Sequence, residues 1–221
     1  MTKKNPYKAH VFNIKKLVYD IAKWSGWPFF LLFRVKNIYE NPNKKTKVKG
    51  GALIISNHLL YSDPMVLHCV YWYRRLHFVV MKELMSNKFK KWFYSSCGCI
   101  PVDRDRFSLS SFRTITQVLE GGNVVVVFPE GHVTLKNDNP MLSFKSGAVM
   151  MAYQANVPII PTYRELRKSV WKRQRVVIGE PINLREKFGE NLGMKEIEEI
   201  TQYLYQKEIE LKEIYHGGKK S

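Results

Sequence analysis

Apolar and polar stretches alternate along this chain from residue 51 onward, and their periods predict strands and helices in turn. Continuous apolar runs predict buried strands at 52–56 and at 123–128, where the sequence NVVVVF is β-branched, as central parallel strands are. Shorter strands are predicted at 76–80, 99–102, 158–163 and 175–179. Apolar residues at helical spacing predict helices at 64–73, 82–96, 108–120, 143–155 and 194–215. The alternation indicates an α/β fold with a mostly parallel sheet flanked by helices.

The first 49 residues have a different pattern, and we expect them to form a membrane-association segment before a domain at 50–221. Helical spacing predicts a helix at 11–23, a breaker follows at 24–28, and an apolar run follows at 29–33. Aromatic side chains beside a breaker and flanked by lysines are typical of a helical hairpin in a membrane interface. The alternative is a hairpin packed on the core of the domain. The residues expected in the interface are Trp24, Trp27, Phe29, Phe30 and Phe33.

Charge reinforces this division of the chain. The 221 residues carry 36 Lys and Arg against 19 Asp and Glu, a formal net charge of +17. The first 50 residues hold twelve of those cations and only two acids, Asp20 and Glu40. Such an excess favours a polyanionic partner such as an anionic membrane surface, a nucleic acid, a phosphorylated substrate or an acidic carrier protein. Composition does not separate these classes.

Two further features bear on compartment. The three cysteines, Cys69, Cys97 and Cys99, are an odd number without metal-ligand spacing, and we expect free thiols in a reducing compartment. No signal peptide is expected, and the apolar run at 27–33 is too short to span a bilayer as a helix.

The first candidate for chemistry is a histidine and an aspartate five residues apart, His58 and Asp63, just after the strand at 52–56. With His58 in the loop and Asp63 in the first turn of the next helix, the chain can fold back and bring the two together. The carboxylate can then fix the tautomer of the imidazole and leave its other nitrogen as a base. Taken alone, the spacing is equally consistent with a loop histidine and a helix-capping aspartate.

Three more stretches follow strands or begin a helix. Arg104, in the run DRDR after the strand at 99–102, could bind a phosphate through paired N–H donors, or could belong to a solvated charge cluster. Glu130 and Gly131 follow the central strand and resemble the rim of a site. Lys145 is expected in the first turn of the helix at 143–155, where the helix dipole disfavours a cation unless an anion is bound there.

These stretches together resemble the glycerolipid acyltransferase family, the group that contains 1-acylglycerol-3-phosphate acyltransferases. Four blocks occur in the family's order over residues 50–180: HLLYSD from His58, GCIPVDR from Gly98, FPEG from Phe128 and VPIIP from Val157. The FKSGA run that contains Lys145 is similar to the family's Phe-Lys-x-Gly-Ala helix start. Four ordered blocks are far more specific than any one of them.

The resemblance implies transfer of a fatty acyl group from an acyl-CoA or acyl-carrier-protein thioester to the hydroxyl of a lysophospholipid, with no metal and no cofactor. The expected acceptor is 1-acylglycerol-3-phosphate, which would give phosphatidic acid. It implies His58 as base, Asp63 as the residue that orients it, and Arg104 with Glu130 and Gly131 in acceptor binding. We add Lys145 as a further candidate for the phosphate. The enzyme is expected on the cytoplasmic face of a membrane, as a peripheral or monotopic protein.

One departure from the family pattern bears on the acceptor. Many phosphatidic-acid-forming members carry Thr-Arg after Phe-Pro-Glu-Gly, and this chain has His132 and Val133 there. Lys136 or Lys145 could replace the missing arginine, or the acceptor is another lysolipid or amphiphile. A nucleic-acid-binding module is disfavoured because the aromatic residues cluster in apolar runs and not among the cations. A catalytically silent lipid-binding relative is disfavoured because His58 and Asp63 are both present.

Overall fold

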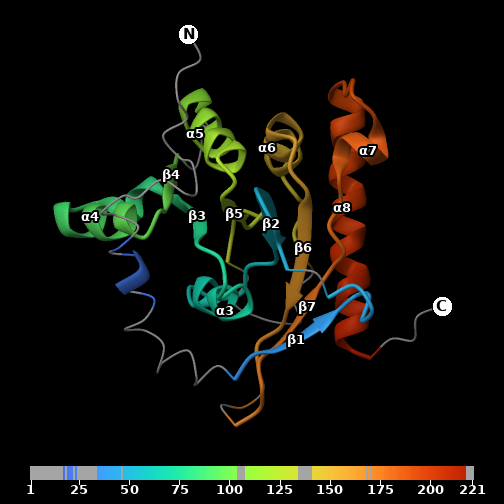
Figure 1. Cartoon of the computed structure of the whole chain (residues 1–221), viewed down its shortest axis with the longest axis horizontal. Helices are drawn as coiled ribbons and strands as arrows, with labels where there is room; N and C mark the ends of the chain where they lie inside the picture. The colour runs from blue at the N-terminus through green and yellow to red at the C-terminus, as the bar shows by residue number, and fades with distance from the viewer. Residues whose placement is uncertain are drawn as a thin grey trace.

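The computed structural model describes residues 17, 19–21, 23, 34–45, 47–103, 108–133, 141–167, 169 and 171–217, and the statements below refer to these. They form a seven-stranded sheet with helices on both of its faces (Figure 1). The strand order is β1-β7-β6-β2-β5-β3-β4. The bounds are Lys36–Tyr39 for β1, Ala52–Ser56 for β2, Leu76–Met81 for β3, Ile100–Val102 for β4, Val124–Val127 for β5, Ile159–Arg164 for β6 and Arg175–Ile178 for β7.

The sheet is mostly parallel, as the sequence predicts. In the centre, β2 pairs in parallel with β5 on one side and with β6 on the other, and β3 continues the parallel run to β4. Only β6 and β7 pair in antiparallel fashion among the described strands. Because β2, β5 and β6 run the same way, the loops that leave their carboxyl ends meet at one edge of the sheet.

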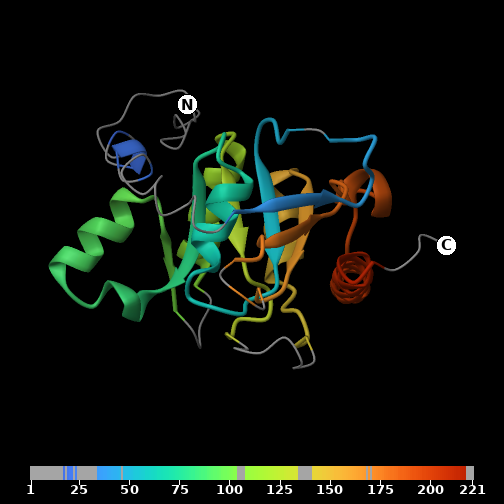
Figure 2. The same ribbon diagram turned by 90° about the horizontal axis from the view of Figure 1, so that it is seen from below.

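The helices bury alternate side chains of the central strands. The helical bounds are Asp63–Val70 for α3, Lys88–Ser96 for α4, Leu109–Glu120 for α5, Gly147–Ala155 for α6, Leu184–Phe188 for α7 and Met194–Tyr215 for α8. Leu53 and Ile55 of β2 pack in one core cluster with α5, α6 and α8, whereas Ala52 and Ile54 pack in a second cluster with α3. Both faces of β2 are therefore covered, which is why its run is apolar throughout. α4 projects from the β3–β4 end of the sheet, and α8 lies at the opposite end (Figure 2).

Most predicted elements occur within a few residues of their expected bounds, and two differ in a way that matters. The helix expected over 82–96 is a short 3₁₀ turn, η1 at Lys82–Met85, followed by α4. The break falls at Asn87, which takes an extended conformation and caps α4 by accepting from the backbone N–H of Lys90 at 2.7 Å. The helix expected from 143 begins only at Gly147.

The amino-terminal section is described only in part. Residues 17, 19–21 and 23 are helical, in line with the helix expected at 11–23. The hydroxyl of Tyr19 in this helix is hydrogen-bonded to Nδ1 of His68 at 3.1 Å. It also accepts a hydrogen bond from the backbone N–H of Leu76 at 2.9 Å. The rest of the expected hairpin, with Trp24, Trp27, Phe29, Phe30 and Phe33, lies outside the described residues. The sequence predicted no strand before residue 50, and β1 is therefore a finding of the structure, paired in parallel with β7.

Candidate active site

His58 and Asp63 meet at the carboxyl end of β2. The Nδ1 atom of His58 lies 2.8 Å from Oδ2 of Asp63, and the aspartate side chain is fully buried. The same oxygen accepts from the backbone N–H groups of Leu59 at 2.7 Å and Leu60 at 3.0 Å. These donors wrap the 59–62 turn around the carboxylate, so the turn folds back as the sequence predicted. The aspartate is the first residue of α3, and its partners hold it as an acceptor.

Arg164 holds the other oxygen of this carboxylate. Its Nη1 lies 2.5 Å from Oδ1 of Asp63, and the arginine is 2% exposed at the end of β6. Asn57 fixes the backbone of Arg164 by accepting from its N–H at 3.1 Å and donating to its carbonyl at 2.8 Å. Burial lowers the pKa of Arg164, and the charge of Asp63 opposes that effect. Arg164 therefore holds Asp63 in place, and Asp63 in turn orients the imidazole of His58.

Sequence reasoning missed Arg164. The predicted strand over 158–163 ended one residue before it, and the VPIIP block was used only as one of the four family motifs. The available signal was an arginine directly after a buried apolar strand, at the edge of the sheet where His58 also lies. That pattern does not predict which residue the arginine pairs with, because Arg164 and Asp63 are 101 positions apart in the chain.

The ring of His58 is fixed on its flat side as well. Phe128, which follows β5, stacks on the imidazole with ring centroids 4.0 Å apart and an interplanar angle of 14°. The imidazole is 17% exposed, so the ring is mostly enclosed but reachable from solvent. An imidazole held by a carboxylate at Nδ1 directs Nε2 outward as the nitrogen that can exchange protons with a substrate.

Glu130 braces the loop that carries His58. Its Oε1 accepts from the backbone N–H of His58 at 3.2 Å and its Oε2 accepts from the N–H of Leu142 at 3.1 Å. Burial raises the pKa of Glu130, and the two backbone hydrogen bonds oppose the rise. The carboxylate therefore ties the loop after β2 to the segment before α6.

Gly131 and Lys145 lie against each other on the open side of this loop. Gly131 has a φ of +71°, and a Cβ atom there would come within 3.2 Å of Nζ of Lys145. Lys145 is exposed. The sequence predicted it in the first turn of the helix, but it lies two residues before α6 begins. Its backbone N–H donates to the carbonyl of Pro129 at 3.1 Å, which fixes it beside the 128–131 turn instead of in the helix. The prediction that Lys145 lies in the first turn of the helix is therefore wrong, and its ammonium group lies beside Gly131.

Arg104 and Lys136 lie outside the described residues. Asp103, just before Arg104, follows β4 and forms an ion pair of 3.6 Å with Lys82. Within the described part of the chain, no group of three His, Cys, Asp or Glu residues could hold a metal ion. No helix in the described part is both long and apolar enough to cross a membrane.

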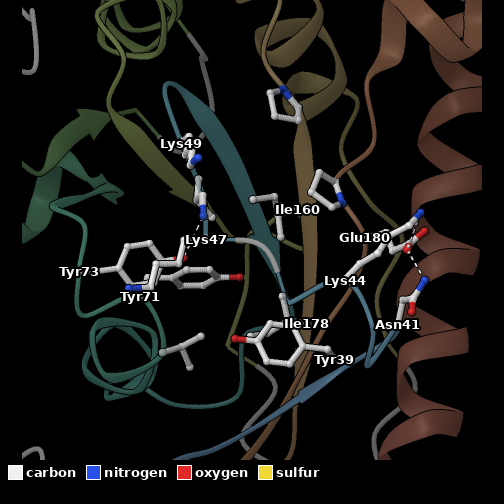
Figure 3. Close-up of a pocket in the computed structure, with 15 residues that line it drawn as sticks. Tyr39, Asn41, Lys44, Lys47, Lys49, Tyr71, Tyr73, Ile160, Ile178 and Glu180 are labelled. Atoms are coloured by element: carbon white, nitrogen blue, oxygen red, sulfur yellow. Dashed lines mark hydrogen bonds and ion pairs between the residues drawn. The ribbon is translucent and has the colours of Figure 1, made fainter.

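A cavity of about 150 Å³ lies elsewhere, at the opposite edge of the sheet (Figure 3). Its walls come from the segment before β2, the end of α3 and the ends of β1 and β7, and include Lys44, Lys47, Lys49, Tyr39, Tyr71 and Tyr73. Lys44 forms an ion pair of 3.3 Å with Glu180 in this wall. Because β2 runs from this cavity toward His58, the length of that strand separates the two.

The fold and this site define an α/β enzyme with a His–Asp pair suited to removing the proton of a hydroxyl group. The chain belongs to the Acyltransferase family, whose model matches residues 34–164. It is 28% identical over 167 residues to the 1-acyl-sn-glycerol-3-phosphate acyltransferase of Bacillus subtilis, covering 73% of this chain and 81% of that protein. It is 26% identical over 189 residues to the enzyme of the same name from Streptococcus pneumoniae, covering 82% of this chain and 69% of that protein.

A solved structure shares the fold. The crystal structure of the 1-acyl-sn-glycerophosphate (LPA) acyltransferase PlsC from Thermotoga maritima matches with a TM-score of 0.57 at 20% sequence identity. The match covers 90% of this chain and 82% of that one. This likeness shows the fold, an α/β fold with a mostly parallel sheet, and the family match shows that the chain is an acyltransferase.

Proposed function

We propose that this acyltransferase moves a fatty acyl group from a thioester to the hydroxyl of a lysophospholipid, with 1-acylglycerol-3-phosphate as the acceptor and phosphatidic acid as the product. The observation that carries the proposal is the 2.8 Å contact between Nδ1 of His58 and Oδ2 of Asp63 within a chain of the Acyltransferase family. The printed names of the bacterial relatives support the choice of acceptor. The donor is acyl-CoA or an acyl-carrier protein.

In this reaction one proton moves first from the acceptor hydroxyl to His58 and then from His58 to the thiolate leaving group. Nε2 of His58 takes the proton of the acceptor hydroxyl while that oxygen attacks the thioester carbonyl carbon. The resulting tetrahedral intermediate carries an oxyanion, which backbone N–H groups or a nearby cation can stabilise. When the intermediate collapses, the carbon–sulfur bond breaks and the imidazolium returns the proton to the departing thiolate. The ester and the free thiol are the products, and no covalent enzyme intermediate is required.

Asp63 and its partners prepare His58 for this step. The carboxylate receives the Nδ1 proton, which fixes the tautomer with Nε2 as the base, and it stabilises the imidazolium that forms. Arg164 and the backbone of the 59–60 turn hold the carboxylate in the orientation that this role needs, because both of its oxygens accept hydrogen bonds there. Glu130 sets the position of the His58 backbone. We propose Glu130 as a positioning residue in addition to its expected part in acceptor binding.

The phosphate of the acceptor would be met by Lys145, together with Arg104. The ammonium group of Lys145 lies over Gly131, beside the loop that braces His58. The absence of the Thr-Arg pair, with His132 and Val133 in its place, supports a second candidate function. In that case the acceptor is another lysolipid or amphiphile, and Lys145 meets a different head group.

A lysophospholipid acceptor lies in a bilayer, so the enzyme has to reach one. We propose that residues 1–49 associate with an anionic membrane surface on the cytoplasmic face and that the protein is peripheral or monotopic. The support is the +10 formal charge of residues 1–50, from twelve cations and two acids, beside five aromatic residues.

The experiment that tests the proposed function is a panel of lysolipid acceptors offered with labelled acyl-CoA and acyl-carrier-protein donors, followed by mass spectrometry of the products. The intact chain should form phosphatidic acid, and His58→Ala should lower turnover by about 10²- to 10⁴-fold. Lys195→Ala is the control, because that side chain is exposed in the first turn of α8. Near-normal turnover in folded His58→Ala protein would refute the mechanism, and an ester product from another acceptor would select the second candidate.

A further inference from the structure

An exposed apolar face on α4 has no cover among the described residues. Phe89 is 71% exposed, Trp92 55% and Phe93 42%. The sequence predicts an apolar side on this helix, and such a side usually faces the core of its own protein. Here it faces outward because α4 projects from the end of the sheet (Figures 1 and 2). Only Ser96 of the helix is buried.

The three aromatic residues form one narrow stripe along the helix. At 100° per residue, Trp92 lies about 60° to one side of Phe89 and Phe93 about 40° to the other. The rings of Phe89 and Trp92 are 6.1 Å apart between centroids, so the stripe is one continuous surface and not a set of scattered side chains. Leu84 of η1, just before the helix, adds another exposed apolar group at 37%.

Cations flank this stripe on both sides. Lys88 and Lys90 lie about 100° from Phe89 in opposite directions around the helix, and Lys91 follows on the far side. All three are exposed, and α4 contains no acidic residue. Large aromatic groups between lysines are the composition of a helix that lies in the head-group region of an anionic bilayer. A protein partner of matching charge would need an acidic rim around an apolar groove, and nothing in this chain selects one.

The position of α4 links this face to the candidate active site. β3 runs parallel to β5, so η1 leaves the sheet at the same edge as Phe128 and His58. A bilayer against the start of α4 would therefore lie on the side of the sheet edge that carries His58. The helical residues between 17 and 23 contact the opposite edge instead, where Tyr19 accepts from the backbone N–H of Leu76 at the start of β3.

We propose that the stripe of Phe89, Trp92 and Phe93, with its flanking lysines, is a second membrane-docking surface that inserts into the head-group region of an anionic bilayer. It acts in addition to residues 1–49, and because η1 leaves the sheet at the edge that carries His58, it brings that edge toward lipid. This deepens the proposed function, because it names how a bilayer-borne acceptor reaches the site.

Two measurements on the full chain test the docking surface. The first is co-sedimentation with vesicles of phosphatidylcholine containing phosphatidylglycerol, for the variant with Phe89, Trp92 and Phe93 each changed to serine. The apparent partition coefficient should fall by about tenfold or more, because three partly inserted aromatic groups are returned to water. The matched control changes three other exposed apolar residues to serine: Leu109, Trp171 and Met194, which are 75%, 83% and 77% exposed.

The charge of the surface is tested in the same assay. Changing Lys88, Lys90 and Lys91 to glutamine should weaken binding to anionic vesicles and remove part of its salt dependence. The control variant changes Lys172, Arg173 and Lys195 to glutamine, which removes the same net charge from exposed positions outside residues 1–49. Equal losses in both lysine variants would show that net charge alone binds the membrane and would overturn the assignment to α4.

The second measurement locates Trp92 directly. Vesicles with brominated acyl chains quench tryptophans that insert. Trp92→Phe keeps the apolar bulk and should remove a share of the quenched emission, whereas Trp171→Phe should not. Unchanged quenching in Trp92→Phe, together with unchanged partitioning of the triple serine variant, would overturn the proposal. A dimer in light scattering that the triple serine variant abolishes would assign the face to a second copy instead.

Turnover of a dispersed short-chain acceptor, which needs no bilayer, tests the proposed function independently of the docking surface. The triple serine variant should retain it, because none of the three residues contacts His58 or Asp63 among the described contacts. If the intact chain acylates no lysolipid, the proposed function fails while the vesicle result still decides the docking surface.

Discussion

The pairing of Arg164 with Asp63 makes a prediction that reaches both stability and catalysis. Arg164→Met keeps much of the apolar length of the side chain and removes its charge and donors. Oδ1 of Asp63 then loses its partner at 2.5 Å while the carboxylate remains fully buried. Removing one member of a buried ion pair typically costs about 3–5 kcal/mol, because the other charge stays in place without compensation. The melting temperature should fall by about 6–20 °C for a domain of this size.

Turnover should fall as well. Asp63 keeps its three contacts through Oδ2, but the plane of the carboxylate is no longer held from both sides. A misplacement of about 1 Å in a catalytic group can cost about 10²-fold in rate, and we expect a loss of that order in kcat with a smaller change in KM. The loss should exceed what partial unfolding explains, so activity is measured well below the melting transition.

The assay is urea unfolding of the full chain followed by tryptophan fluorescence, with Arg113→Met as the matched control. Arg113 is exposed on α5, and its replacement should change the free energy of unfolding by no more than about 0.5 kcal/mol. A double-mutant cycle with Asp63→Asn isolates the pair, because the aspartate change should cost less once the arginine is gone. A loss below about 1 kcal/mol in Arg164→Met, or strict additivity in the cycle, would refute the reasoning.

Two further predictions concern other charged groups. Glu208 of α8 is fully buried, neither of its oxygens has a hydrogen-bond partner among the described residues, and burial raises its pKa well above the ordinary value, with Glu130 adding to the rise. The carboxyl of Glu208 then keeps its proton in the folded state, whereas the unfolded chain releases that proton above about pH 4.3. The free energy of unfolding therefore decreases as the pH rises, by at most about 1.4 kcal/mol per pH unit. Glu208→Met and Glu208→Gln should both gain stability relative to the intact chain between pH 4.5 and 8 in urea titrations, and a pH-independent difference would contradict the shift. Lys145→Met should raise the KM for a phosphate-bearing acceptor about tenfold, as expected for loss of one charge-assisted contact, with little effect on an acceptor without phosphate or in the control Lys195→Met. An unchanged KM would exclude Lys145 from the head-group site.

The strands and helices of the domain follow from local pattern. Continuous β-branched runs such as Val124–Val127 have few alternatives to a buried strand, and α8 begins and ends where its apolar spacing predicts. β1 escaped prediction because KNIY is a short, half-polar edge strand, whose stability comes from its pairing with β7 and not from its own composition. The late start of α6 has a similar cause: the backbone of Lys145 bonds to Pro129, a contact from outside the helix.

The sequence by itself determined the class of fold, because strands and helices follow from residues close together in the chain. It also made contact between His58 and Asp63 the expected arrangement, once the four motif blocks were taken together. Only the tertiary structure decided what surrounds that pair. Arg164, Phe128 and Glu130 reach it from β6 and from the loop after β5, and their approach depends on parallel strand order that no local pattern encodes. The outward direction of the α4 stripe was decided in the same way. An amphipathic spacing shows that a helix has an apolar side, and only the packing of the whole domain shows whether that side is covered.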